Sequence, residues 1–290
     1  ADVGGTKIAI TVAAPDGTVL RETAYPAEGW AAAPVDAAAR WLFGHLARAV
    51  PEGDEIAAVG IGAQGCDTQE HCTRLAAAIE ALGVAATVVN DASLLVPAAG
   101  LDSGIGVIAG TGSIAVGVDR AGAVLFSGGW GWVLGDEAGA PAIVREATKA
   151  ALAAFDAGRA GDGLLAALLA HFGVPDPPAL ARAVNDEPTP ENWGPAAPAV
   201  FRAADEGSPL AAGVIDAAAR ALQSLVARLV ERGAVGTTVV AAGSVIVRQP
   251  RLADRFRVHL ARAQPGLELR LLDVPPVAGA VALARRVAAR

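Results

Sequence analysis

The sequence predicts an α/β protein of two lobes, and three observations support this fold class. The chain has 290 residues, enough for one large or two medium domains, since single hydrophobic cores stop growing at roughly 250–300 residues. Short apolar segments rich in β-branched residues alternate with segments of helical spacing, which favours parallel strand pairing. A unit of strand, glycine-rich turn and strand occurs near residue 5 and again near residue 111, so we expect two similar lobes facing one cleft.

Composition excludes several classes of protein. Hydrophobic residues make up 53% of the chain and charged residues 18%, which is typical of a folded domain. The net charge of -7 argues against nucleic acid as a general partner, because a phosphate backbone needs a concentrated Lys/Arg surface. No uninterrupted apolar run reaches the roughly 18 residues of a membrane helix, and no signal-like segment precedes the first motif. We therefore expect a cytoplasmic protein without a membrane partner.

The first lobe is assigned to residues 1–102 together with 277–290. Its expected elements are strands at 8–14, 19–20, 56–62 and 86–90, helices at 35–50 and 73–82, and a final helix at 277–290 that packs back onto this lobe. The chain starts at Ala1, almost directly on the first glycine turn, and we expect the strand that leads into this turn to extend upstream.

The second lobe is assigned to residues 103–276. Its expected strands are 106–109, 114–118, 124–126, 236–242 and 267–272, and residues 140–233 are expected to be mostly helical. Two proline-rich segments, 174–178 and 188–195, interrupt the helical region and are predicted to be surface loops.

Two glycine turns have the composition of phosphate-binding loops. The first contains Asp2, Gly4, Gly5, Thr6 and Lys7, and the second contains Gly110, Thr111, Gly112 and Ser113. Glycines allow backbone N–H groups to approach phosphate oxygens without a Cβ clash. Asp2 is a candidate for the water shell of Mg²⁺, which prefers carboxylate and water oxygens. Plain hairpin turns are the structural alternative for both.

Asp91 is the candidate catalytic base. It follows an apolar strand, and the carboxyl ends of strands are where open α/β sheets present ligand-binding residues. A carboxylate at such a place can accept the proton of an attacking hydroxyl. The alternative is an N-cap for the helix that follows Asn90-Asp91-Ala92-Ser93, and both roles are compatible.

Two further glycine-rich segments supply candidate ligand contacts. In Gly128–Gly139, Asp136 and Glu137 are expected to bind a polyhydroxy substrate or a metal, with Trp130 and Trp132 as an apolar wall; the alternative is a capped helix start with buried indoles. Gly243 and Ser244 end a predicted strand and are expected to admit adenine and ribose, unless they form an ordinary strand-to-helix turn.

Cys66 and Cys72 are the two cysteines, with Asp67 and His71 between them. A structural zinc site needs four Cys/His ligands, usually in paired spacings, and no second cluster follows here. The pattern therefore indicates two reduced cysteines in and after a loop.

The four turns, in this order, resemble the actin-like ATPase superfamily. More narrowly, Asp2–Lys7, Asn90–Ala92, Ala109–Ser113, Gly128–Glu137 and Pro276–Ala280 resemble the BadF/BadG/BcrA/BcrD family, which includes N-acetylglucosamine kinases. The resemblance implies two ribonuclease H-like lobes with a central interlobe cleft. It also implies ATP and Mg²⁺ as cofactors and a homodimer.

The resemblance implies that the protein phosphorylates N-acetylglucosamine or a related amino sugar or hexose. Asp91 matches the family's base, and Asn90, Gly129, Trp130, Asp136 and Glu137 match its sugar-binding segments. The loop Tyr25–Trp30 replaces an Asn-containing loop of the amino-sugar enzymes, so the identity of the sugar stays open. Cys66 and Cys72 do not match the iron–sulfur ligands of the family's other branch. The alternative function is a nucleotide-switch ATPase that acts on a protein partner.

Overall fold

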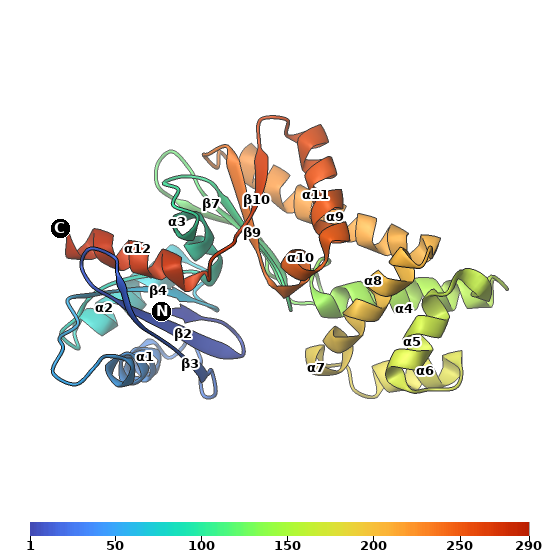
Figure 1. The fold of residues 1–290 in the computed structure, drawn as a ribbon, viewed down its shortest axis with the longest axis horizontal. Coiled ribbons are helices and arrows are strands. Elements are labelled where there is room, and N and C mark those ends of the chain that lie inside the picture. Colours follow the sequence, from blue (N-terminus) through green and yellow to red (C-terminus); the bar gives the residue numbers. More distant parts are fainter. Residues whose placement is uncertain (290) are drawn as a thin grey trace.

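The computed structural model describes residues 1–289, except for the side chain of Ala160. The described chain forms two five-stranded sheets, each covered by helices (Figure 1). This arrangement confirms the predicted mixed α/β fold with two lobes. The boundaries at residues 102/103 and 276/277 stay a proposal.

The first sheet has the strand order β3-β2-β1-β4-β5. Its strands are β1 (Asp2–Val3), β2 (Lys7–Ala13), β3 (Val19–Pro26), β4 (Ala58–Ala63) and β5 (Ala85–Val89), with helices α1 (Val35–Ala49) and α2 (Gln69–Glu80). Strand β1 pairs antiparallel with β2 and parallel with β4. β3 is longer than expected because it pairs with all of β2, from Lys7 opposite Pro26 onwards. α2 begins before residue 73 because the Thr68 side chain accepts a hydrogen bond from the His71 N–H at 3.1 Å and caps the helix.

The second sheet repeats this pattern, in the order β10-β9-β6-β7-β8. Its strands are β6 (Ile105–Ala109), β7 (Ser113–Val118), β8 (Val124–Gly128), β9 (Thr238–Ala242) and β10 (Glu268–Leu271). β6 pairs antiparallel with β7 and parallel with β9. The central strand of each sheet thus leads through a glycine turn into its antiparallel neighbour.

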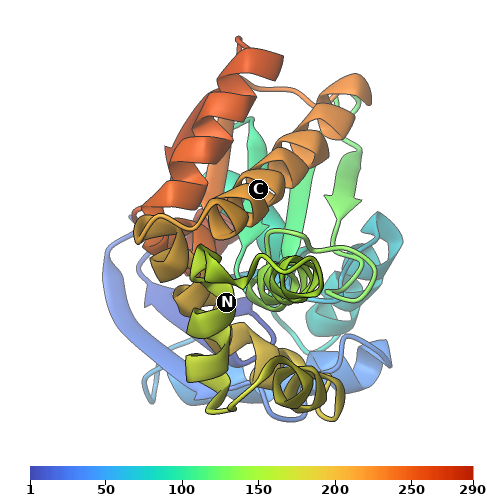
Figure 2. The same cartoon turned by 90° about the vertical axis from the view of Figure 1, so that its right-hand side faces the viewer.

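Helices fill most of the chain between β8 and β9, and Figure 2 views the molecule from the side of several of them. They are α4 (Ala140–Asp156), η2 (Ala160–Asp162), α5 (Leu164–Phe172), α6 (Pro177–Asn185), α7 (Pro190–Trp193), η3 (Gly194–Ala196), α8 (Ala197–Asp205) and α9 (Pro209–Glu231). After β9 come α10 (Ser244–Arg248) and α11 (Pro250–Ala263).

The prediction that both proline-rich segments are surface loops was wrong in part. Pro177 and Pro190 begin helices, since proline at a first helical position loses no intrahelical bond, and the side chains of Asp176 and Thr189 cap these helices. Trp193 is buried, and its indole N–H donates to the carbonyl oxygen of Val184 at 2.9 Å. The second segment therefore anchors α7 to the core.

Helix α9 is the one helix of the described residues that is by itself long and apolar enough to cross a membrane, judged by length and composition. Helices α5 and α6 pass the same test only as a pair, which is bent by 57°. Helix α9 packs against α4, α8 and α11. Its charged Asp216 pairs with Arg255 and His259 of α11. These contacts are typical of a core helix in a globular lobe.

The two sheets meet around η1 (Asp91–Leu94), α3 (Leu95–Ala98) and α12 (Val277–Ala288). α12 comes last along the chain, yet it lies against β4 of the first sheet (Figure 1). The approach is close enough that a Cβ on Gly60 would overlap the carbonyl oxygen of Ala280. The final helix thus packs on the first lobe, as expected.

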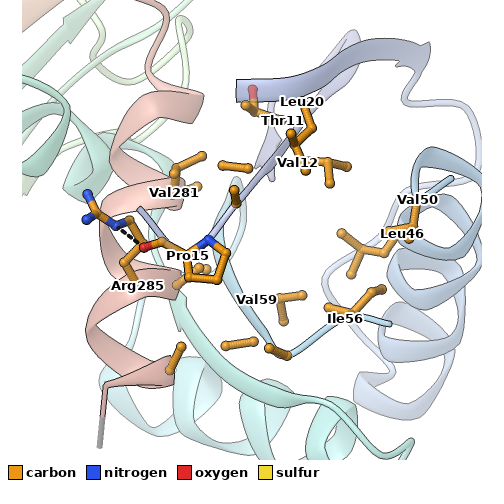
Figure 3. Close-up of a pocket in the computed structure, with 18 of the residues that line it drawn as sticks. Thr11, Val12, Pro15, Leu20, Leu46, Val50, Ile56, Val59, Val281 and Arg285 are labelled. Carbon is orange, nitrogen blue, oxygen red and sulfur yellow. Dashed lines mark hydrogen bonds between the residues drawn. The ribbon is translucent and has the colours of Figure 1, made fainter. Parts of the chain in front are cut away.

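A cavity of about 590 Å³ lies between β2 and β4, with α1 on one side and α12 on the other (Figure 3). β1 pairs with these strands only through Asp2 and Val3, so no strand of the described residues separates Thr11–Ala13 from Ala58–Gly60. The lining is mostly apolar, and Arg285 donates to the Pro15 carbonyl oxygen at 3.1 Å. This cavity lies at the amino end of β4, whereas the candidate site lies at its carboxyl end.

Candidate active site

The first glycine turn is closed by one backbone bond, from the N–H of Gly4 to the carbonyl oxygen of Lys7 at 3.0 Å. Gly5, Thr6 and Lys7 are exposed. Among the described residues, the amides of Gly5 and Thr6 have no acceptor. Two N–H donors of this turn are therefore free for a ligand, while that of Gly4 is used by the turn itself.

The second turn is more enclosed. The Gly110 N–H donates to the Gly112 carbonyl oxygen at 2.9 Å, and the Gly110 carbonyl accepts from the Ala140 N–H at 2.8 Å. Ser113 is buried in β7, whereas Thr111 is exposed. In the described chain the amides of Thr111 and Gly112 have no acceptor, so this turn also offers two free N–H groups.

Gly243 and Ser244 lie directly beside the second turn. A Cβ on Gly110 would lie 3.5 Å from the Ser244 nitrogen. Gly243 has φ 112°, a conformation that side-chain-bearing residues rarely adopt, and a Cβ there would overlap the backbone of Ala109. The structure thus places the end of β9 against the second glycine turn.

Asp91 is the first residue of η1, and the N-cap of this short helix is Asn90, so the alternative role of Asp91 as the N-cap was wrong. The Ala92 N–H donates to Asp91 Oδ1 at 2.9 Å and to Asn90 Oδ1 at 3.0 Å. Asn90 is 3% exposed, and its Nδ2 donates to Asp67 Oδ1 at 2.9 Å. Both the oxygen and the nitrogen of the Asn90 amide therefore already have a hydrogen-bond partner.

The environment of Asp91 raises the pKa of its carboxyl group to about 7. Burial is the largest cause, followed by the negative charge of Asp2 and, more weakly, that of Asp67, while the Ala92 hydrogen bond opposes the shift. Burial also raises the pKa of Asp2. A carboxyl group with a pKa near neutrality suits proton transfer at physiological pH.

Three glycines hold η1 between the two lobes. A Cβ on Gly62 or Gly279 would overlap Leu94. A Cβ on Gly106 would lie 2.5 Å from the Ala92 carbonyl oxygen. As a result η1 contacts β1 and β4 of the first sheet and β6 and β7 of the second. The sequence analysis included Gly279 in the segment Pro276–Ala280 but missed Gly62 and Gly106. A glycine inside a strand is a signal of close backbone approach, and Gly62 and Gly106 lie inside predicted strands.

Asp136 lies deep in the loop that follows β8. It is the single non-glycine residue of the described chain with positive φ, at 55°, and it is 8% exposed. Its Oδ1 has no hydrogen-bond partner among the described residues, and a Cβ on Gly112 would lie 2.6 Å from its Oδ2. Burial raises the pKa of Asp136. A strained, buried carboxylate with an unpaired oxygen beside a phosphate turn is a candidate ligand contact.

The rest of this loop is divided between surface and core. Trp130 is 75% exposed and Glu137 is exposed. Trp132 instead packs on Trp193, with ring centroids 4.8 Å apart. The two tryptophans therefore do not form one apolar wall.

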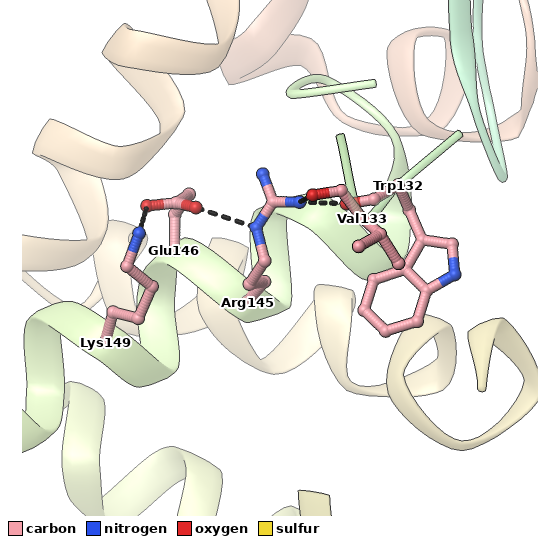
Figure 4. A network of polar contacts seen from close by, with 5 residues as sticks. All are labelled: Trp132, Val133, Arg145, Glu146 and Lys149. Atoms are coloured by element: carbon pink, nitrogen blue, oxygen red, sulfur yellow. Dashed lines mark hydrogen bonds and ion pairs between the residues drawn. The ribbon is translucent and has the colours of Figure 1, made fainter. Parts of the chain in front are cut away.

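Arg145 of α4 holds the loop backbone (Figure 4). Its guanidinium donates to the carbonyl oxygens of Trp132 and, at 3.3 Å, of Val133. Glu146 pairs with Arg145 at 2.8 Å and with Lys149 at 2.7 Å. The loop tip is thus tied to the first turns of a long helix.

Cys66 and Cys72 are free, as predicted, and both are buried. The Cys72 thiol donates to the Cys66 carbonyl oxygen at 3.4 Å, and its hydrogen bond with the Cys66 thiol, together with burial, raises the pKa of Cys66. His71 Nε2 lies 2.8 Å from the carbonyl oxygen of Ala32. The Cys72 thiol and the His71 ring thus both contact backbone carbonyl oxygens. Within the described part of the chain no three His, Cys, Asp or Glu side chains are grouped to hold a metal.

Comparisons with known proteins agree with this geometry. The family described as "BadF/BadG/BcrA/BcrD ATPase family" matches residues 1–284. An N-acetylmuramic acid/N-acetylglucosamine kinase from Clostridium acetobutylicum is 41% identical over 107 residues, which is 36% of this chain and 35% of that protein's length.

Solved structures with the same fold include two sugar kinases by description. A candidate N-acetylglucosamine kinase from Chromobacterium violaceum is 25% identical, with a TM-score of 0.70 over 97% of this chain and 96% of the other. A ROK family glucokinase from Streptomyces griseus, solved with glucose and AMPPNP, is 22% identical, with a TM-score of 0.60 over 98% of each chain; it shows likeness of fold alone. With its turns, its strand-end aspartate and a family match that spans nearly all its length, the chain belongs to the BadF/BadG/BcrA/BcrD ATPase family.

Proposed function

We propose that the protein transfers the γ-phosphoryl group of ATP to a sugar hydroxyl, with Asp91 as general base. The observation that carries this proposal is the position of Asp91 on η1, which contacts the central strands of both sheets. N-acetylglucosamine or a related amino sugar or hexose is the proposed acceptor, in line with the names of the relatives.

Asp91 has the chemistry for the proton transfer. The Ala92 N–H fixes Oδ1, and a pKa of about 7 leaves a large fraction of the carboxyl groups ionised at neutral pH. The carboxylate accepts the proton of the hydroxyl while the hydroxyl oxygen bonds to the γ-phosphorus. The bond from that phosphorus to the β–γ bridging oxygen breaks, and ADP leaves with the electron pair.

Backbone donors would hold the triphosphate. The free amides of Gly5 and Thr6 face it from the first turn, and those of Thr111 and Gly112 from the second. Lys7 adds a positive charge at the exposed first turn. Gly243 and Ser244, beside the second turn, would accommodate ribose and adenine.

The residues present fit a Mg²⁺ ion carried by the nucleotide. Mg²⁺ usually keeps several waters and binds one or two carboxylates plus substrate phosphates, which agrees with the lack of a three-ligand cluster in residues 1–289. Asp2 would hold it, since its carboxyl group lies near Asp91, with Asp136 as a second candidate because its Oδ1 is unpaired. When bound, the ion would neutralise charge that develops on the phosphates.

The acceptor would lie against the loop after β8. Gly129, Trp130, Asp136 and Glu137 are the proposed contacts; Trp130 and Glu137 are exposed, and Asp136 offers its unpaired oxygen. Asn90 has one remaining amide hydrogen, because its oxygen caps Ala92 and its nitrogen donates to Asp67. Its proposed contact with sugar is therefore a minor one beside its role in η1.

The test is ADP release with ATP and Mg²⁺ against N-acetylglucosamine, glucosamine, N-acetylmuramic acid, glucose and N-acetylmannosamine. One sugar should raise turnover far above the water background. A flat panel with nucleotide still bound would contradict the proposal and favour the nucleotide-switch alternative. A cytoplasmic homodimer is part of the proposal, and the mass of the protein in solution tests the dimer.

A further inference from the structure

The loop that joins β4 to α2, residues 64–68, contacts two parts of the proposed site. Gln64 lies on the first turn, since a Cβ on Gly5 would lie 2.9 Å from Gln64 Oε1. Asp67 Oδ1 accepts a hydrogen bond from Asn90 Nδ2 at 2.9 Å. One short loop therefore reaches both the phosphate turn and the segment that carries Asp91.

The orientation of the Asn90 amide follows from its partners. The Ala92 N–H points at one end of the amide, at 3.0 Å, and a backbone N–H can only donate, so that end is the oxygen. The NH₂ group consequently faces Asp67. Because Asn90 is 3% exposed, loss of this acceptor would leave a buried donor largely unsatisfied, which is costly.

The loop backbone is anchored on both sides of Asp67. The Trp30 indole N–H donates to the Gln64 carbonyl oxygen at 3.2 Å, and the Cys72 thiol donates to the Cys66 carbonyl oxygen at 3.4 Å. On the other side, Thr68 caps α2. Asp67 is exposed, yet its loop is tied down by hydrogen bonds on both sides, one of them between the buried Cys66 and Cys72, as a group that supports a functional side chain should be.

We propose that Asp67 is a positioning residue for Asp91. It holds the Asn90 amide, the amide oxygen holds the Ala92 N–H, and the same N–H orients the Asp91 carboxyl group. The inference rests on the proposed kinase activity and adds to it a residue that lies outside the glycine motifs. The hydrogen bond, more than the charge of Asp67, carries this role.

Paired variants separate these contributions. Asp67→Ala removes the acceptor. It should lower kcat about tenfold, because a small misplacement of a catalytic group slows the reaction strongly. The KM for ATP should change less than about twofold. Asp67→Asn keeps a carbonyl acceptor and should recover most of the kcat. Glu70→Ala, an exposed residue in the first turn of α2, is the matched control and should leave kcat unchanged.

A double-mutant cycle tests the connection to Asn90. Asp67→Ala combined with Asn90→Ala should lose no more kcat than the worse single variant, because both break the same bond. Additive losses would overturn the proposal. So would a wild-type kcat in Asp67→Ala, or an Asn variant as slow as the Ala variant.

A measurement without turnover distinguishes this inference from the proposed function. Hydrogen exchange of the Asn90 side-chain NH₂, followed by NMR, should be at least about tenfold faster in Asp67→Ala than in wild type or Asp67→Asn. Equal exchange in all three proteins would overturn the inference. If exchange follows the expected pattern across the three proteins but the wild type phosphorylates no sugar, the proposed function is overturned and the hydrogen bond of Asp67 is not.

Discussion

In the first sheet, β1 lies between antiparallel β2 and parallel β4, and in the second sheet β6 has the same kinds of neighbour. The segments that follow the parallel strands differ. β4 and β5 lead to Asp67 and Asp91, whereas β9 leads to the uncharged Gly243 and Ser244. One strand order thus supports two different sets of residues at the strand ends, so these residues and not the topology set the chemistry.

The two glycine turns differ in the same way. The first turn is open, with Gly5 and Thr6 exposed, and the flexible Gln64 lies against it. The second turn is enclosed by the loop that carries Asp136, through the bond from the Ala140 N–H to the Gly110 carbonyl oxygen. We expect the second turn to tolerate change less well than the first.

The largest expected effect is on turnover, when Asp91 at the end of β5 is changed. Asp91→Asn keeps the shape of the side chain but removes the base, so turnover should fall at least about 1000-fold, within the range of general-base contributions. ATP affinity, measured by calorimetry, should change less than about threefold because the Asp91 side chain is not among the proposed nucleotide contacts. Retained turnover would remove Asp91 from the mechanism.

The junction between the two sheets is tested by stability. Gly279→Ala places a Cβ on the carbonyl oxygen of Leu94, and we expect a loss of about 3 kcal/mol in the free energy of unfolding, as for overpacked cores. Gly213→Ala is the control. Gly213 is exposed in α9 with no atom near a built Cβ, so this change should add about 0.5–1 kcal/mol. Urea unfolding of both variants gives the answer, and equal stabilities would rule out a close contact at Leu94.

The two turns can be compared directly by adding one methyl group to each. Gly112→Ala would push a Cβ to 2.6 Å from Asp136 Oδ2, in a buried site that cannot easily relax. We expect its ATP affinity to fall about 10- to 100-fold. Gly5→Ala meets only the end of an exposed side chain, and about threefold is expected. If nucleotide titration shows a larger loss of ATP affinity in Gly5→Ala than in Gly112→Ala, the second turn is not the less tolerant of the two.

The smallest effect per step of the experiment concerns pH, at about tenfold for each unit. Because the base must be ionised and the pKa of Asp91 is raised to about 7, kcat/KM should fall about tenfold for each pH unit below that value. Burial favours the neutral acid and so raises the pKa of Asp91. The fall in kcat/KM therefore begins at a higher pH than an ordinary aspartate would give. A rate that stays level down to pH 5 would show that Asp91 is not the titrating group.

Local signals in the sequence were sufficient for the lobes, the four turns and the strand-end position of Asp91. They were insufficient wherever a contact joins distant segments. Asp67 meets Asn90, and Gly279 meets Leu94, only after the chain has folded. Trp193 was assigned to a loop because prolines surround it, yet its indole is buried against Trp132. Periodicity reports which face of an element is apolar, but not which partner covers it.

The placement of α12 has a consequence for the order of folding. α12 is made after both sheets, yet it packs on β4 of the first sheet, and its Gly279 contacts Leu94, three residues after Asp91. Contacts between such distant segments form late, since the chain between them must first be ordered. Asp91 therefore acquires this support only after the second sheet has been made, and a chain that stops before α12 would lack it.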